Sequence, residues 1–250
     1  MTAPDVLVTD DGAVRTVTLN RPHRLNAFTA TTYRALADIL AAAGTDDGVA
    51  VVVLLGAGRS FSSGVDLKAL AAAEDTGDLR REFDTLVGTL AGFPKPLLAG
   101  VQGSAVGFGM TLLLHADVVL AADDAQFRPP FTVLGTAPEA ASSWLLPRLV
   151  GYQRAAELLF TSRWVSADEA VHLHLVARCC PPDRLNSEVT ALAQEIAALS
   201  PAAVQAAKRL LRADWPRGVR DALDREYAAT AELRAELRPP GRRGTDPDSR

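Results

Sequence analysis

Continuous aliphatic runs and amphipathic stretches alternate along the chain. Residues 49–55 are aliphatic throughout, which is typical of a strand buried on both faces of a parallel sheet. Residues 29–43 instead place their apolar side chains three and four positions apart, which predicts an amphipathic helix that ends at Gly44. Residues 6–20 predict two strands joined at the turn signal Asp10-Asp11-Gly12.

The same patterns predict the remaining elements. Further strands are expected at 97–101, 117–121 and 175–180, with an extended stretch at 125–128. Helices are expected at 66–73, 79–91, 112–114, 154–160, 166–172, 182–199, 201–212 and 217–237, and a short one is expected to start at Pro138. We therefore predict a mixed α/β core over residues 1–198, a helical region over 199–237, and a disordered tail over 238–250 that is rich in Pro, Gly and Arg.

Composition narrows the class of protein. The 250 residues are 48% hydrophobic and 22% charged, as in an ordinary soluble globular domain. The net charge of -4 argues against nucleic-acid binding, and no apolar run is long enough to span a membrane. The N-terminus lacks the pattern of a signal peptide, and the adjacent Cys179 and Cys180 suit neither an ordinary disulfide nor a metal site. We therefore expect a cytoplasmic protein.

A glycine-rich turn follows the strand predicted at 97–101. Gly103, Gly107 and Gly109 allow a tight backbone turn before an apolar, helix-like stretch, and a helix N-terminus can hold an anion or a developing oxyanion. A phosphate loop is excluded because no lysine follows, and the dinucleotide fingerprint fails because position 112 is Leu. From this turn alone, an oxyanion site and simple helix–strand packing both remain open.

The same arrangement occurs earlier in the chain. The buried strand at 49–55 leads into a loop of small residues at 56–65, and a helix follows from Asp66. If the two turns meet, each can offer a backbone N–H to one carbonyl oxygen.

Glu139 has a local interpretation as well as a chemical one. It follows Pro138, which suits the first turn of a helix, where a carboxylate is favoured by the helix dipole. On local sequence alone, Glu139 is therefore a helix-start glutamate.

Four motifs together resemble the crotonase superfamily, the enoyl-CoA hydratase/isomerase group. They are Asn20-Arg21-Pro22 with Leu25-Asn26-Ala27, Phe61-Ser62-Ser63-Gly64-Val65-Asp66-Leu67, the turn Gly103–Gly109, and Leu134-Gly135-Thr136-Ala137-Pro138-Glu139. The resemblance covers roughly residues 6–215. It implies a spiral of β-β-α turns and C-terminal helices that form a homotrimer, or a hexamer from two trimers.

The resemblance also implies site residues for an acyl-CoA thioester. The two N–H groups of an oxyanion hole fall on Val65 and Phe108. Residues that match positions holding the CoA adenine are Arg24 to Ala27, Ser63, Asp66 and Leu67, and candidate phosphate contacts are Lys68, Arg24 and Lys208. Each of these three cations can equally be a solvated surface side chain.

The catalytic acids distinguish activities within the superfamily. A resembling hydratase carries glutamates at the positions of Thr111 and Phe131, so hydration is not expected here. Glu139 instead matches the catalytic glutamate of Δ3,Δ2-enoyl-CoA isomerases, in which one carboxylate moves one proton. The resemblance implies that neither a metal nor a redox cofactor is needed. Coenzyme A is part of the substrate and is not a separate cofactor. An apolar lining of Phe131, Leu134 and Trp144 is expected to raise the carboxyl pKa toward neutrality.

Other readings remain open. One is a different crotonase activity, such as hydration, thioester hydrolysis or a C–C bond step, since one fold hosts many chemistries. Another is a non-catalytic acyl-CoA-binding protein, although a binder has no need of a carboxylate beside the thioester.

Overall fold

A six-stranded sheet forms the centre of the structure, a computed structural model that describes residues 4–72 and 76–236. Its strand order is β1-β2-β3-β4-β6-β9; β1 and β2 are antiparallel and the other neighbours are parallel. These strands are β1 (Val6–Asp11), β2 (Val14–Leu19), β3 (Val51–Gly56), β4 (Leu97–Val101), β6 (Val118–Ala122) and β9 (Arg178–Cys180). A smaller sheet has the order β5 (Ser104–Val106), β7 (Gln126–Arg128) and β8 (Val165–Ser166).

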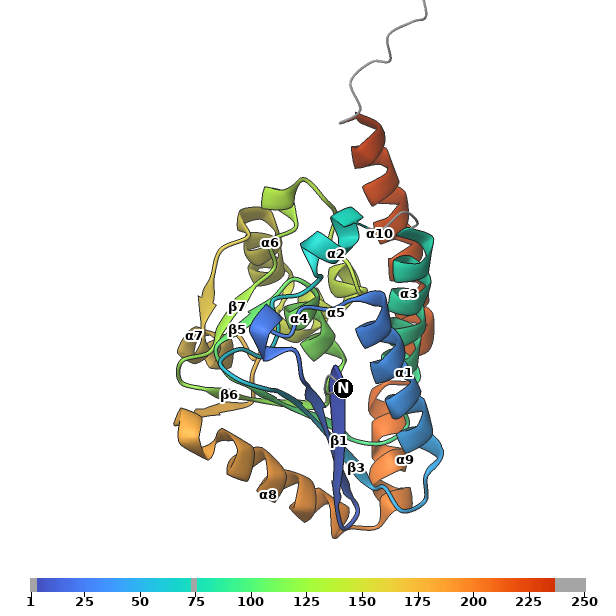
Figure 1. Cartoon of the computed structure of the whole chain (residues 1–250), viewed down its shortest axis with the longest axis vertical. Coiled ribbons are helices and arrows are strands. Elements are labelled where there is room, and N and C mark those ends of the chain that lie inside the picture. Colours follow the sequence, from blue (N-terminus) through green and yellow to red (C-terminus); the bar gives the residue numbers. More distant parts are fainter. Residues whose placement is uncertain (1–3, 73–75, 237–250) are drawn as a thin grey trace, which may run out of the picture.

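Helices surround both sheets (Figure 1). They are α1 (Ala30–Thr45), α2 (Leu67–Ala72), α3 (Thr76–Gly92), α4 (Phe108–Thr111), α5 (Ser142–Val150), α6 (Tyr152–Thr161), α7 (Ala167–His172), α8 (Leu185–Ala197), α9 (Pro201–Leu211) and α10 (Trp215–Glu236). Short 3-10 helices cover Pro22–Arg24, Leu112–His115, Thr132–Leu134 and Pro182–Arg184. The tail predicted at 238–250 lies outside the described residues.

Strand β3 shows why its sequence is aliphatic throughout. Val51 and Val53 face one side of the sheet and pack in the same cluster as Val189 of α8. Val52 and Leu54 face the other side, in the cluster that includes α1 and α3. Figure 1 shows α8 and the pair α1 and α3 on opposite sides of the sheet. The strand is therefore buried on both faces, as its sequence predicts.

The prediction that a helix begins at Pro138 is wrong. Helix α5 begins at Ser142, because Ala140 and Ala141 have positive φ angles of 57° and 60°, which a right-handed helix does not allow. Glu139 therefore lies in an irregular segment before the helix, and its interpretation as a helix-start glutamate is also wrong.

Several boundaries differ from the sequence pattern. Helix α3 begins at Thr76 instead of residue 79, and the helix predicted at 182–199 is divided between the 3-10 helix Pro182–Arg184 and α8. The helix after the glycine-rich turn begins at Phe108, earlier than predicted, and continues as the 3-10 helix Leu112–His115. Strand β9 covers only Arg178–Cys180 of the predicted 175–180, because residues 175 and 176 instead turn back to the carbonyl of Ala170.

Helix α10 packs against α3 and α5 and so reaches the part of the fold where Glu139 lies. Within the described ranges, no helix has both the length and the apolar character needed to cross a membrane.

Candidate active site

The two glycine-rich loops lie side by side as two short extended segments. Phe61 N–H donates to Gln102 O at 2.8 Å, and Ser62 N–H donates to Ser104 O at 3.0 Å. Val106 N–H returns a bond to Ser62 O at 3.0 Å. The meeting of the two turns that the sequence allows is therefore present.

Gly64 is the point of closest approach between these loops. It has a φ of +85°, and a Cβ placed there would lie 2.6 Å from Val106 O and 3.3 Å from Phe108 N. Only glycine tolerates both the backbone angle and the contact. The approach brings the peptide that precedes Val65 next to the first N–H of α4.

The backbone N–H groups of Val65 and Phe108 are available to a ligand. Phe108 is the first residue of α4, so its N–H has no acceptor within the helix. Phe28 pairs with the Gly64 carbonyl at 2.8 Å and with the Asp66 N–H at 2.9 Å, which leaves the Val65 N–H pointing away from that pairing. Within the described residues, neither N–H has a backbone acceptor among the turn, loop and cap hydrogen bonds.

A third loop supports this arrangement. Asn26 is buried and donates from Nδ2 to Ala57 O and Ser60 O, both at 2.8 Å. Ser62 Oγ donates to Asn26 O at 2.9 Å and accepts from Gly64 N–H at 3.1 Å. The Asn26 and Ser62 side chains thus fix the loop that carries Val65, a structural role that the sequence motif did not specify.

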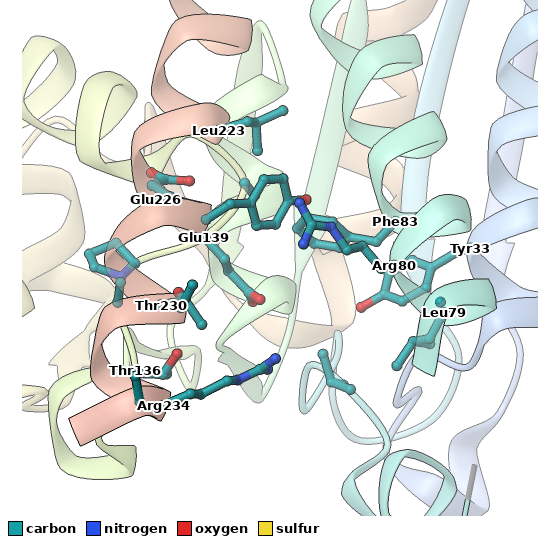
Figure 2. Close-up of a pocket in the computed structure, with 18 residues that line it drawn as sticks. Tyr33, Leu79, Arg80, Phe83, Thr136, Glu139, Leu223, Glu226, Thr230 and Arg234 are labelled. Atoms are coloured by element: carbon teal, nitrogen blue, oxygen red, sulfur yellow. The ribbon is translucent and has the colours of Figure 1, made fainter. Parts of the chain in front are cut away.

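A cavity of about 600 Å³ opens beside Val65. Its apolar walls come from Tyr33 of α1, Leu79 and Phe83 of α3, and Leu223 and Tyr227 of α10. Polar lining residues include Arg80, Thr136, Glu139, Glu226, Thr230 and Arg234. Figure 2 shows the Glu139 carboxyl group and the Tyr33 hydroxyl pointing toward one another across this cavity.

Glu139 is the acid whose protonation the cavity alters most clearly. Burial, and after it the nearby negative charge of Glu226, together raise its pKa from 4.5 to about 7. A carboxyl group with a pKa near neutrality can both take and return a proton at physiological pH.

Tyr33 and Glu226 were not predicted from the sequence. The Tyr33 hydroxyl is buried and, among the described residues, has no hydrogen-bond partner. Its pKa lies well above 10, because of burial and the Glu139 charge, so it is a neutral hydrogen-bond donor. Glu226 comes from α10, more than 80 positions after Glu139, and only the tertiary structure brings the two together.

The prediction that Phe131, Leu134 and Trp144 form the apolar lining is corrected by the structure. None of the three is among the described residues that line the cavity. Phe131 is buried in the main core, Leu134 is 59% exposed, and Trp144 packs edge-on against Trp215. They are neighbours of Glu139 in sequence, whereas the wall opposite Glu139 is built by α1, α3 and α10.

The residues predicted for CoA binding near the two loops fall into three groups. Arg24, Leu67 and Lys68 are exposed near the loops, where a phosphate or adenine contact stays a prediction. Ser63 is half-buried and Ala27 is buried, so they can offer chiefly backbone atoms. The Asp66 carboxylate is already engaged by Arg21 and by Ala69 N–H at 3.1 Å.

Lys208 cannot serve as the predicted phosphate contact. It is 7% exposed, and its Nζ donates to Asp117 Oδ2 at 2.7 Å and to Lys95 O at 2.6 Å. Burial lowers its pKa to about 8. Its ammonium group ties α9 to the start of β4 and to Asp117, just before β6.

Lys208→Met is expected to lower the free energy of unfolding by roughly 1–3 kcal/mol, because it leaves the Lys95 carbonyl without this donor and removes one of the two cations that pair with Asp117, the other being Arg212. Lys68→Met, at an exposed position, is the control: its stability should stay unchanged and its affinity for CoA esters should fall. Urea unfolding and a CoA-ester titration on both variants check this. A stable Lys208→Met protein with weakened CoA binding would reverse the two assignments.

Comparisons with known proteins show the family of this chain. The profile of the enoyl-CoA hydratase/isomerase family matches residues 9–237. Rat "Enoyl-CoA delta isomerase 2" is 39% identical over 215 residues, which are 83% of this chain and 54% of that protein. The chain thus spans about half the length of this relative. A "Probable enoyl-CoA hydratase echA12" from Mycobacterium bovis is 38% identical over 205 residues, covering 78% and 72%.

The fold is also found in solved structures. The crystal structure of an enoyl-CoA hydratase/isomerase from Pseudoalteromonas atlantica matches with a TM-score of 0.87 at 35% identity, covering 93% of this chain and 92% of that one. The family profile and this likeness each extend over most of the chain. The protein therefore belongs to the enoyl-CoA hydratase/isomerase family of the crotonase superfamily and has its α/β fold.

Proposed function

We propose that this protein isomerises 3-enoyl-CoA to 2-enoyl-CoA. The observation that carries the proposal is Glu139, the one carboxylate among the described lining residues that accepts no backbone hydrogen bonds, with its pKa raised to about 7 in a cavity that Val65 also lines. Moving a double bond by one position transfers one proton, so one carboxylate suffices.

The proposed mechanism uses both parts of the site. The thioester oxygen accepts hydrogen bonds from the N–H groups of Val65 and Phe108, which stabilise negative charge on that oxygen. Glu139 takes a proton from C2, and the electrons spread into a dienolate. Glu139 then returns the proton to C4, so that the double bond lies between C2 and C3 and the mass is unchanged. The reaction needs neither a metal nor a redox cofactor.

Hydration is a less favourable reading of the same cavity. It needs one group to activate water and another to protonate the α-carbon. Thr111 and Phe131 occupy the positions where resembling hydratases carry glutamates. The second carboxylate in the cavity, Glu226, already accepts hydrogen bonds from two backbone N–H groups through its two oxygens, so it is not free to activate water.

A direct assay tests the proposal. Purified protein is mixed with a medium-chain 3-enoyl-CoA, and the ultraviolet band of the conjugated 2-enoyl thioester and the product mass are followed. Conjugation at unchanged mass is the expected result. Addition of water would indicate a hydratase, free CoA a thioester hydrolase, and binding without any product a non-catalytic acyl-CoA-binding protein.

The pH dependence is a second expectation. Glu139 must be ionised to take the proton, so kcat should fall about tenfold for each pH unit below its pKa of about 7 and level off above it. Initial rates between pH 5.5 and about 9 check this. A rate that stays flat down to pH 5.5 would rule out a base with this pKa.

The proposal also includes the metabolic role, the cellular location and the oligomeric state of the protein. We place the protein in fatty-acid metabolism, in the cytoplasm, where two free neighbouring thiols, Cys179 and Cys180, stay reduced. We also propose a homotrimer or a hexamer built through the C-terminal helices, as the resemblance to the superfamily implies.

A further inference from the structure

The turn that carries Glu139 is held in a strained conformation. Ala140 and Ala141 are both left-handed, with φ angles of 57° and 60°. For a residue other than glycine this costs about 1–2 kcal/mol. Two such residues in succession persist only where neighbouring groups hold them in place.

Two side chains hold this turn from different parts of the chain. His115 Nε2 lies 2.9 Å from Ala140 O. Burial lowers the pKa of His115 to about 4, so the ring is neutral, and its Nε2–H donates to the carbonyl. Glu226 accepts Ala141 N–H on Oε2 and Ser143 N–H on Oε1, both at 2.9 Å.

Glu226 also caps the N-terminus of α5. No side chain next to the start of α5 caps its first N–H groups, and Glu226 does so from α10. It is 5% exposed and lines the same cavity as Glu139. Figure 2 shows Glu226 on α10, next to the segment from which Glu139 extends into the cavity.

We propose that Glu226 is a positioning residue for Glu139, an inference that rests on the proposed function. Its two oxygens fix the strained turn, and its negative charge favours the protonated form of Glu139. Glu226 thereby holds the proposed base in place and adds to the effect of burial in moving the pH at which that base becomes active.

The charges around the pair support this role. Among the described residues, the other titratable groups that line the cavity or act on Glu226 are Tyr33 of α1, Arg80 of α3, and Arg225, Tyr227 and Arg234 of α10. Asp84 of α3 accepts the Tyr227 hydroxyl, and neutral His115 contacts the turn at Ala140. Arg80 lies over the Tyr227 ring and near Asp84. Among the charges of the described residues, it is Glu226 that raises the pKa of Glu139, in addition to burial.

The central test compares Glu226→Gln with Glu232→Gln, an exposed position on the same helix. In Glu226→Gln we expect kcat to fall by at least about tenfold, because one N–H meets an amide NH2 group and the turn loosens. The acidic limb of the rate profile should move to lower pH, because the repelling charge is gone. Glu232→Gln should leave both unchanged. A lower kcat with an unmoved limb would reduce Glu226 to a structural residue and overturn the proposal.

Two measurements without turnover separate this inference from the proposed function. The carbon-13 signal of the Glu139 carboxyl group, assigned by its loss in Glu139→Gln, should titrate at lower pH in Glu226→Gln than in the wild type. Hydrogen exchange at the Ala141 and Ser143 amides should be at least about tenfold faster in the variant. If the protein fails to isomerise any enoyl-CoA, the proposed function falls, while these two readouts still decide the role of Glu226.

Glu226→Asp is a second variant for use if Glu226→Gln does not fold. Glu226→Asp keeps the charge but cannot reach both N–H groups, so we expect a lower kcat with the acidic limb in place. The wild type alone also gives an answer, since its Ala141 and Ser143 amides should exchange slowly. Rapid exchange at both amides would show that Glu226 does not hold the turn.

Discussion

Replacing Glu139 by glutamine is expected to lower the rate of isomerisation by roughly 10³-fold or more, the scale of a lost general base. Glutamine has nearly the same shape but cannot take a proton from C2. Binding of an acyl-CoA should change little, because the N–H groups of Val65 and Phe108 belong to the backbone. Steady-state rates and a calorimetric titration check both parts, and a Gln variant with near-normal rates would remove Glu139 from the mechanism.

The same substitution should stabilise the folded protein at high pH. The pKa of Glu139 is about 7 in the folded protein, against 4.5 for an ordinary glutamate, so the folded state binds this proton more tightly than the unfolded chain does. Its contribution to the free energy of unfolding therefore falls as the pH rises from 4.5 to about 7. Above that range the ionised group costs up to roughly 3 kcal/mol, which the Gln variant does not pay.

Urea unfolding of wild type and variant at two pH values, one near each end of that range, measures this gain. The stability difference between the two proteins should grow with pH. Glu195→Gln, an exposed position on α8, is the control and should show no such difference. A Glu139→Gln protein that is less stable than the wild type at high pH would mean that the carboxylate is held by favourable contacts and is not a poised base.

Gly64→Ala is expected to disable the site by a different route. The new Cβ would lie 2.6 Å from Val106 O and 3.3 Å from Phe108 N, so the two loops must separate. Loss of one oxyanion donor typically lowers kcat by about 10²–10³-fold. We expect a loss of that size together with a stability loss of a few kcal/mol, from the clash and the strained φ angle.

Gly151→Ala separates the two causes. Gly151 has a φ of +83°, close to the +85° of Gly64, but a Cβ there would meet nothing within 4 Å. It should therefore lose about 1–2 kcal/mol of stability, from the backbone angle alone, and keep its kcat. Rates and thermal unfolding of both variants make the comparison. If both variants lose activity equally, the loop contact at Gly64 does not shape the site.

The sequence predicted the parts of the site that depend on local pattern. Each of the two loops follows a buried strand, and the carboxyl ends of parallel strands meet at one edge of a sheet, so their approach could be expected. The fold class and the family follow from the same motifs. Glu139 was singled out by its match to the glutamate of the isomerases and not by its local pattern. The helix predicted around it was wrong, because nothing in the alanines at 140 and 141 signals left-handed backbone.

What the sequence did not predict depends on long-range packing. An amphipathic pattern tells which face of α3 or α10 is buried but not what it packs against, so Tyr33, Phe83 and Glu226 could not be assigned to the cavity. The burial of Lys208 could not be predicted for the same reason, since its sequence neighbours do not reveal that it forms an ion pair with Asp117. Surface cations and buried ion-pair cations look alike until the fold is known.

The contribution of α10 to the cavity has a consequence for biosynthesis. The cavity residues of α10, from Leu223 to Ala235, come later in the chain than all the described lining residues of the other elements, so ribosomes complete the strands and both loops first. A nascent chain that has folded its sheet still lacks one wall of the cavity and the group that holds the Glu139 turn. Catalytic activity should therefore appear late, when α10 has left the exit tunnel and packed against the rest of the protein. A protease that removes α10 should inactivate the enzyme and leave most of the fold intact.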